Sequence, residues 1–423
     1  MPHAAYAQAA FGSAWTAPAP PPVHALPAPG PGEIVCVTGP SGAGKTLALK
    51  ALGGRELPAL SDAPVLDLFA PGLASEFVLR TLARTGLADG RLWRLGTPQL
   101  SAGEQQRLRL ALALCNLAPG ELLVADEFDA HLDPLTACAL AQVLRRLADG
   151  GLRMAVSTHN PATLPHMAPD RLLQIDGDVR ALAPPAREDL GDEVVITPGR
   201  LADWRHFRHW HYLGAGNPGP VCAVYVAALR GRRAGIAIYG YPHRLLSARR
   251  HALPVLLHPP QPDTAALNRD LRLLQRVVVD PRLRGVGIAR RLLEHGCRAL
   301  GVPYIECVAR MGAFTGFLTA AGFARVCELE LPRAIASLLR FCERREIDST
   351  RLIQPAYREY LRQRLPAADC AALARHLRAV AQSRANTGHG ASRGHEPPQA
   401  VLESALARLH ARPAYFLWQA MAP

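Results

Sequence analysis

A glycine-rich loop carries the residues best suited to bind phosphate. Ile34 to Thr38 is an apolar, β-rich run that leads directly into Gly-Pro-Ser-Gly-Ala-Gly-Lys-Thr and then into an Ala/Leu-rich helix. Glycines let successive backbone N–H groups turn toward one centre, and the helix start adds partial positive charge. Lys45 is expected to reach the β- and γ-phosphates of a nucleotide, and Thr46 to offer a hydroxyl to magnesium. The residues predicted to hold the phosphates are Gly39, Ser41, Gly42, Gly44, Lys45 and Thr46.

Two carboxylates follow a second apolar run, Leu122 to Ala125. A buried strand that ends in acids has the form of a Walker B strand when it shares an α/β unit with a phosphate-binding loop. We expect Asp126 to hold magnesium, directly or through water. Glu127 is expected to polarise the attacking water as the general base of ATP hydrolysis.

A third motif, Leu-Ser-Ala-Gly-Glu-Gln-Gln-Arg, spans residues 100–107. Ser101 with Glu104 forms a capping box that opens a Leu/Ala helix, and Gly103 permits close backbone approach. The motif resembles the signature sequence of ABC ATPases, the ATP-binding cassette family of P-loop proteins. The resemblance implies that Ser101 and Gly103 complete the nucleotide site of a second copy, so ATP would be sandwiched in a homodimer.

Two further motifs follow in the order of that family. The segment from Asp129 to Asp133 is similar to the D-loop at its final Leu-Asp, and His159 ends a strand in the place of the switch histidine. The resemblance implies that His159 contacts the γ-phosphate and acts with Glu127 and Lys45 in catalysis, and that Asp133 belongs to the nucleotide site. Between Thr46 and Leu100 no clear Q-loop glutamine is found, which argues against a permease partner. The residue that stacks on adenine is not identified, and Trp15 is the candidate.

A second strand, loop and helix occurs further along the chain. Leu274 to Val279 is followed by Asp-Pro-Arg-Leu-Arg-Gly-Val-Gly and then by a helix from Arg290 to Leu300. Such a turn presents amides to a pyrophosphate. The loop is similar to the coenzyme A motif of GNAT acetyltransferases, and the later segments agree with that family's order. The resemblance implies acetyl-CoA binding by Arg282, Arg284, Gly285, Gly287 and Ile288.

Acyl transfer to an amine needs a base and an acid near the thioester. His211, Tyr212 and Glu306 are the chemically suitable candidates. Each candidate also has a non-catalytic explanation: His211 would lie on a basic helix face, Tyr212 would lie in the core, and Glu306 would pair with Arg310.

Strands alternate with helical patterns across two regions of the chain, which predicts an α/β fold with two domains. The first is the P-loop ABC-type ATPase domain, 32–182, and a proline-bearing linker spans 183–193. A GNAT-like α/β acyltransferase domain follows at 194–330, and then a mainly helical region at 331–423. Residues 1–31 read as a partly disordered lead-in and 383–398 as a flexible loop. The apolar segment 415–418 is expected to dock back on a domain.

Composition narrows the location and the partners. The 423 residues contain 9 scattered cysteines, no metal-binding Cys/His cluster and no apolar run long enough to cross a bilayer, which favours a soluble cytoplasmic protein. The formal charge of +13 attracts phosphate-bearing partners, nucleic acid among them, although arginine abundance can also reflect genome composition.

Together these features predict ATP-driven dimerisation coupled to an acyl-CoA-dependent transferase that acts on nucleic acid or on a nucleic-acid-bound target. In that reading, Trp204 to Tyr212 would supply stacking and phosphate contacts. The alternatives are the ATP-binding subunit of a transporter with an appended regulatory domain, and a small-molecule N-acetyltransferase regulated by ATP.

Overall fold

The computed structural model describes residues 3–11, 23–211, 216–258, 260–310, 315–382, 406, 409 and 413–420. Tyr212, Trp15 and all of the expected loop 383–398 lie outside these ranges. The chain divides into two compact units: residues 1–74 with 81–190, and residues 75–80 with 191–423. Near the N-terminus, His3–Phe11 forms helix α1, where the sequence predicts a loosely ordered lead-in.

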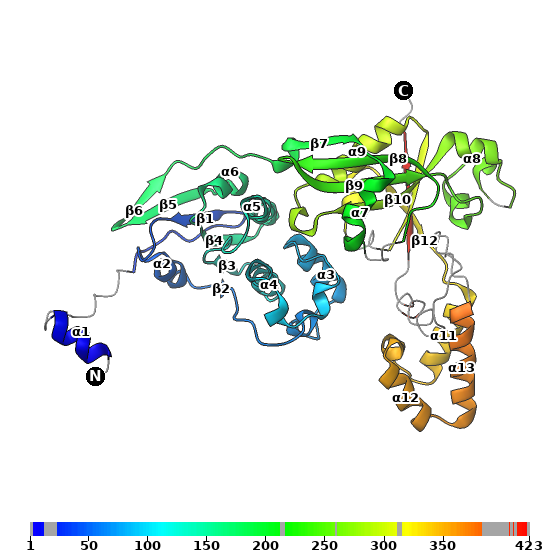
Figure 1. The fold of residues 1–423 in the computed structure, drawn as a ribbon, viewed down its shortest axis with the longest axis horizontal. Helices are drawn as coiled ribbons and strands as arrows, with labels where there is room; N and C mark the ends of the chain where they lie inside the picture. Colours follow the sequence, from blue (N-terminus) through cyan, green and yellow to red (C-terminus); the bar gives the residue numbers. More distant parts are fainter. Residues whose placement is uncertain are drawn as a thin grey trace. The chain divides into compact units, whose positions relative to one another are not determined.

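The first unit is built on a six-stranded mixed sheet in the order β2-β3-β4-β1-β5-β6 (Figure 1). Strands β1 to β5 pair in parallel, and β6 pairs with β5 antiparallel. The strands are β1 (Ile34–Thr38), β2 (Arg55–Glu56), β3 (Leu122–Ala125), β4 (Arg153–Ser157), β5 (Arg171–Asp176) and β6 (Asp178–Leu182). The helices are α2 (Lys45–Ala51), α3 (Ser75–Arg84), whose residues are shared between the two units, α4 (Ala102–Cys115), α5 (Pro134–Asp149) and α6 (Leu164–Met167).

The core of this unit explains why β3, the first four residues of β1 and the middle of β4 are apolar without interruption. Parallel strands covered on both faces bury every side chain, so they lack the alternation of a half-exposed strand. Ile34 and Cys36 face one core cluster with α4 and α5, whereas Val37 faces a second cluster with Ala48 and Leu49 of α2. The carboxyl ends of these parallel strands therefore meet along one edge of the sheet.

The second unit holds a seven-stranded sheet in the order β12-β13-β11-β10-β9-β8-β7. Only β10 and β11 pair in parallel. The strands are β7 (Val194–Pro198), β8 (Val221–Leu229), β9 (Arg232–Gly240), β10 (Leu271–Val279), β11 (Tyr304–Ala309), β12 (Ala324–Glu328) and β13 (Ala414–Gln419). The helices are α7 (Trp204–Phe207), α8 (Thr264–Asp270), α9 (Ile288–Leu300), α10 (Phe317–Ala320), α11 (Arg333–Arg344), α12 (Pro355–Arg364) and α13 (Ala367–Gln382).

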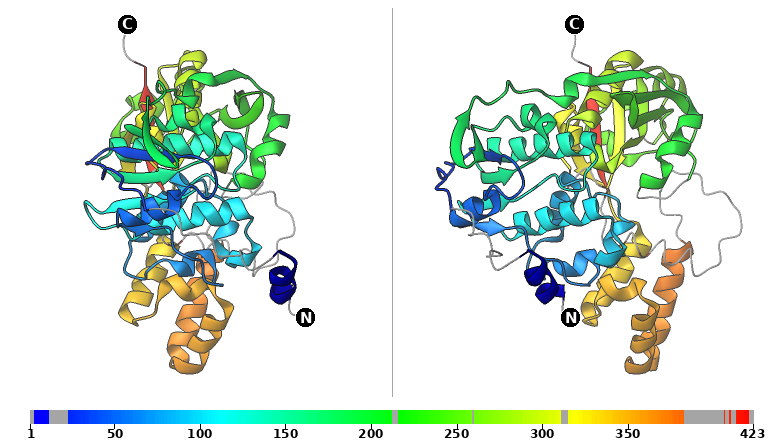
Figure 2. Two further views of the ribbon diagram at one scale, coloured as in Figure 1. Left: turned by 90° about the vertical axis from the view of Figure 1, so that its left-hand side faces the viewer. Right: turned by 60° about the vertical axis from the view of Figure 1, so that its left-hand side comes forward.

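The C-terminal segment enters this sheet as a strand. β13 lies between β11 and β12 and pairs antiparallel with both, and Figure 2 shows it in red within the sheet. The expected docking of the tail is thus confirmed and takes the form of strand insertion. Helices α11, α12 and α13 have their own core, which includes Leu338, Phe341 and Leu352. Within the described residues, no helix has the length and apolarity that a membrane crossing requires.

Candidate functional site

The phosphate-binding loop connects β1 to α2 through three glycines with positive φ. Gly39, Gly42 and Gly44 have φ values of 140°, 80° and 92°, which disfavour other residues. A Cβ at Gly39 would also lie 2.1 Å from the carbonyl oxygen of Ile175, so β5 leaves no space for a side chain. Ser41 and Gly42 are exposed, as a loop that receives a ligand requires.

Lys45 is the first residue of α2, and its ammonium is folded back over the loop. Its Nζ donates to the carbonyl oxygens of Gly39, at 2.9 Å, and Pro40, at 2.7 Å. Burial lowers the pKa of Lys45, and the nearby carboxylates of Glu127 and Asp126 oppose that shift. The amine is therefore held against the carbonyl groups of the loop.

Thr46 and Asp126 come together from different elements. The Thr46 hydroxyl donates to Oδ2 of Asp126 at 2.6 Å, and Ser157 Oγ donates to the other carboxylate oxygen. A hydroxyl and a carboxylate are hard oxygen ligands of the type that Mg²⁺ prefers beside phosphate oxygens. The pair fits the expected magnesium site, and Ser157 orients its carboxylate.

Glu127 is held by its backbone in a strained left-handed conformation with φ 46°. Its N–H donates to Ser157 Oγ at 2.8 Å, and its carbonyl accepts from Nε2 of Gln106 at 2.9 Å. Its carboxylate Oε1 lies 3.1 Å from Nε2 of His159. Both side chains are about half exposed, so the pair can meet solvent and substrate. The candidate base and the candidate switch histidine are 32 residues apart in the sequence, but their side chains are in contact because β3 and β4 are neighbouring strands.

The signature segment has a local structural role as well. Ser101 caps α4 in a reciprocal box, since its N–H donates to Oε2 of Glu104 at 2.9 Å and the Glu104 N–H donates to Ser101 Oγ at 3.3 Å. A Cβ at Gly103 would lie 2.8 Å from the carbonyl oxygen of His131, so the glycine admits the D-loop segment of the same chain. Asp133 caps α5 by accepting from Thr136. No hydrogen bond within the described residues joins Ser101 or Gly103 to the loop around Lys45.

In the second unit, the expected coenzyme loop joins β10 to α9. Gly285 and Gly287 have φ values of 88° and 93°, and Gly287 is the N-cap residue of α9, with no capping side chain. Arg282 makes a two-point contact with the buried Asp280, at 3.0 and 2.7 Å, and Arg284 donates weakly to the Val279 carbonyl, at 3.4 Å.

Ile288, also expected to bind the coenzyme, is 1% exposed. Its side chain therefore belongs to the core, and its backbone amide remains as the group that can serve a ligand. The guanidinium of Arg282 is paired with Asp280, and its side chain is 39% exposed.

The two described acid–base candidates of this unit, His211 and Glu306, have different surroundings. His211 has an edge-on ring contact with the buried Trp204, with centroids 5.7 Å apart. Tyr212 lies outside the described residues. Glu306 is fully buried and accepts two hydrogen bonds from Arg249, at 2.9 and 2.7 Å, and a third from the Tyr415 hydroxyl, at 3.2 Å. The expected pairing of Glu306 with Arg310 is wrong: its ion-pair partner is Arg249.

Several supporting residues escaped the sequence analysis. Ser157 and Gln106 fix the backbone or carboxylates of the two acids after β3, and Arg249 neutralises Glu306. Gln106 lies within the signature motif and Ser157 lies two residues before His159, so the positions of both residues in the sequence could have pointed to the site. Arg249 is 57 residues from its partner and gave none.

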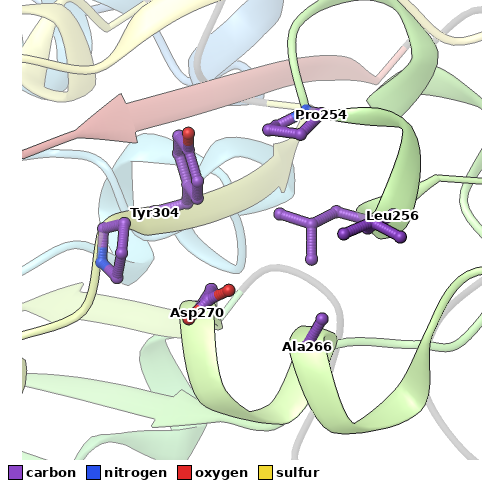
Figure 3. Close-up of a pocket in the computed structure, with 7 residues that line it drawn as sticks. Pro254, Leu256, Ala266, Asp270 and Tyr304 are labelled. Atoms are coloured by element: carbon purple, nitrogen blue, oxygen red, sulfur yellow. The ribbon is translucent and has the colours of Figure 1, made fainter.

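A cavity of about 330 Å³ lies elsewhere in the second unit (Figure 3). Its lining is mainly apolar, and its one carboxylate, Asp270, is paired with Arg269. Tyr304 in its wall pairs with Leu271 at the start of β10, whereas the glycine loop follows the end of β10. The cavity and that loop are thus at opposite ends of the strand. The lining residues are Pro254, Leu256, Leu257, Ala266, Asp270, Pro303 and Tyr304.

Curated ATP-binding proteins are similar to about a third of the chain or somewhat more. No family model matches the sequence. The lipoprotein-releasing system ATP-binding protein LolD 1 of Rhodospirillum rubrum is 32% identical over 177 residues, which cover 31% of this chain and 76% of that protein. LolD of Paramagnetospirillum magneticum is 34% identical over 190 residues, 34% of this chain and 81% of that protein. The hemin import ATP-binding protein HmuV of Bordetella pertussis is 32% identical over 218 residues, 40% of this chain and 80% of that protein.

Among solved structures, a dimeric bacterial ABC transporter cassette is similar at 22% identity, over 37% of this chain and 87% of that one, with a TM-score of 0.33. The matched residues span most of the length of these two LolD proteins but only about a third of this chain. The curated relatives, more than 30% identical and matched over more than two thirds of their length, show that the chain belongs to the family of ABC ATP-binding proteins.

Proposed function

We propose that the first unit hydrolyses MgATP and that residues 32–182 form its domain. The proposal depends chiefly on a network of hydrogen bonds in which Ser157 contacts both acids after β3, Thr46 contacts Asp126, and His159 contacts Glu127. Lys45 and the loop amides bind the β- and γ-phosphates. Thr46 and Asp126 hold the magnesium ion, which neutralises phosphate charge. Glu127 accepts the proton of the attacking water, and His159 orients that carboxylate.

A second copy completes the site in this proposal. The start of α4 offers backbone N–H groups and a partial positive charge to an anion. Because residues 100–107 resemble the signature sequence of ABC ATPases, we propose that Ser101 and Gly103 serve the γ-phosphate of a partner chain. The result is a two-fold homodimer with two equivalent nucleotides.

We further propose that the second unit binds acetyl-CoA or another acyl-CoA. The uncapped start of α9 and the two left-handed glycines suit a pyrophosphate. The parallel pairing of β10 with β11 runs only from Leu271 with Tyr304 to Leu273 with Glu306, although β10 continues to Val279. The coenzyme's extended amide arm could lie along the backbone of β10 beyond that pairing.

Amide hydrogen exchange in the intact chain tests coenzyme binding. Millimolar acetyl-CoA is expected to slow exchange in residues 282–288 and to leave α13 unchanged. Gly287→Ala should weaken this protection, because alanine is strained at φ 93°. Gly301→Ala is the matched control, since Gly301 has φ 59° at the other end of α9 with free space around it. Wild-type protein without any protection at 282–288 would contradict coenzyme binding.

The acceptor that we propose is nucleic acid or a nucleic-acid-bound target. Residues 191–423 hold 33 Lys and Arg against 17 Asp and Glu, a net of +16, whereas residues 1–190 hold 15 against 18, a net of −3. The positive charge of the chain is therefore a property of the second unit. In the described part of the segment expected to stack on bases, residues 204–211, Trp204 and Phe207 are buried core residues, and the exposed side chains are Arg205 and Arg208 with two histidines. That surface suits phosphates more than bases.

ATP turnover with and without DNA or RNA tests this reading. Nucleic acid is expected to raise turnover several-fold at low salt, with the effect declining as salt increases. Lys45→Ala should abolish both basal and stimulated turnover. The chain's other lysine, Lys50, is exposed and pairs with Glu56, so Lys50→Ala is the matched control and should behave as wild type. If neither DNA nor RNA alters ATP turnover, the proposal that nucleic acid or a nucleic-acid-bound target is the acceptor fails.

A transporter subunit is the second candidate, and the names of the relatives favour it. LolD belongs to a lipoprotein-releasing system and HmuV to hemin import. In that case the second unit would be a regulatory domain, and the chain would bind a membrane protein rather than nucleic acid. An ATP-regulated N-acetyltransferase for a small amine would instead require acetyl-CoA protection without any nucleic-acid effect on turnover.

A further inference from the structure

Asp129 and Thr158 form a hydrogen bond between the D-loop segment and the end of β4. Thr158 Oγ1 donates to Oδ2 of Asp129 at 2.6 Å, and the Thr158 hydroxyl in turn accepts from the N–H of Asn160 at 2.9 Å. Thr158 is 1% exposed, so the contact lies inside the protein. The proposed mechanism assigns no role to either residue.

The contact is one of three made by consecutive residues at the end of β4. Ser157 binds the carboxylate of Asp126 and the N–H of Glu127. Thr158 binds Asp129, and His159 lies 3.1 Å from the Glu127 carboxylate. The segment after β3 is thus attached to β4 on both sides of Glu127. Backbone hydrogen bonds from the Phe128 N–H to the Ser157 carbonyl and from the Thr158 N–H to the Val37 carbonyl, both at 3.3 Å, also hold these segments. The Thr158 hydroxyl adds the side-chain contact that lies directly beside His159.

Asp129 also belongs to the turn that meets the signature helix. The Leu132 N–H donates to the carbonyl of Asp129 at 3.2 Å. The carbonyl of His131, the residue before Leu132, closely approaches Gly103. His131 has a left-handed φ of 63°. One short turn therefore connects the start of α4 with the end of β4.

We infer that Asp129 is a positioning residue, which acts through Thr158 to hold His159 against Glu127 and links that pair to the signature helix. This inference rests on the proposed ATP hydrolysis. Burial raises the pKa of the Asp129 carboxyl, while the Thr158 hydrogen bond opposes the rise. A group that served only to close the turn could be neutral and would avoid that cost.

Steady-state kinetics of the full chain test the inference. Thr158→Val removes the hydroxyl without changing the shape of the side chain, and we expect kcat to fall about tenfold or more while KM for ATP changes less than about twofold. Thr158→Ser should restore most of the rate, because it restores the donor. Asp129→Ala should also lower kcat, and the double variant should be no slower than Thr158→Val, which already lacks the contact with Asp129 as well as the one with the Asn160 N–H.

Thr85→Val provides the matched control. Thr85 is also buried and donates its hydroxyl to backbone carbonyls of α3, far along the chain from the acids, so its loss should leave kcat unchanged. Retained ATP binding by the Thr158→Val protein shows that it is folded.

Three results would overturn the inference: a rise in KM at unchanged kcat, wild-type kinetics for Thr158→Val, or additive losses in the double variant. If the wild-type chain shows no turnover that depends on Glu127, the proposed ATPase itself fails and the inference with it.

Discussion

Replacing Glu127 by Gln is expected to lower ATP turnover by about two to four orders of magnitude, the range typical of a lost general base. Glutamine preserves the shape of the side chain but cannot accept a proton. The backbone contacts of residue 127 to Ser157 and Gln106 do not involve the carboxylate, so the loop and its φ of 46° should persist. ATP binding should therefore survive, and the measurement is kcat together with the affinity for ATP.

The same variant tests the dimer. With hydrolysis blocked, MgATP should remain between two copies, so light scattering should report twice the mass of the ATP-free chain. Glu121→Gln is the matched control, because Glu121 precedes the same strand and pairs with Arg55 at the surface. A Glu127→Gln protein that turns over ATP at the wild-type rate would refute the assignment of the base. One that binds ATP but stays monomeric would refute the sandwich.

The second large effect is expected at Glu306. Glu306 and Arg249 are both fully buried, and Arg249 also donates to the carbonyls of His243 and Arg244. Glu306→Gln would leave the Arg249 charge without a counter-ion in the interior, a change that costs about 3–5 kcal/mol. The sheet of the second unit should then open more readily around β11 and β13. Hydrogen exchange in these strands should accelerate by about a hundredfold or more, provided that they exchange through this opening.

Two comparisons make this result specific. Glu328→Gln removes an exposed ion pair with Arg325 on β12 and should cost no more than about 1 kcal/mol. Replacing both partners, as Arg249→Met with Glu306→Leu, should recover much of the stability, because no unpaired charge remains. If Glu306→Gln exchanged no faster than Glu328→Gln, Glu306 would not be the structural anchor that its contacts indicate.

The prediction at Glu306 also bears on acyl transfer. A carboxylate that accepts three hydrogen bonds and has no exposed surface is poorly placed to take a proton from an acceptor amine. His211 then remains the described candidate for acid–base chemistry in the second unit, and Tyr212 remains a prediction outside the described residues. The sequence could not separate these three, because their chemical type is equally suitable in each case.

Much of the phosphate site could be predicted from the sequence because its chemistry is local. The turn from β1 through Gly39, Gly42 and Gly44 into α2 is a continuous segment, and its glycines, its lysine and its helix start follow from short spacings. The capping box of Ser101 and Glu104 is local in the same way. The helix that this box opens ends at Cys115, and the segment from Trp204 is one short helix and a 3₁₀ turn.

The sequence alone determined which residues could bind phosphate, which acids could serve magnesium and water, and that two α/β patterns follow each other along the chain. Only the tertiary structure decided which side chains contact those residues and the acids near them: Ser157 binds Asp126, Thr158 binds Asp129, and Arg249 neutralises Glu306. It also decided that β13 enters the sheet between β11 and β12. The physical reason is the range of the contacts. Turns and caps are encoded within a few residues, whereas strand order and buried charge pairs join segments 29 to 109 residues apart and leave no local period.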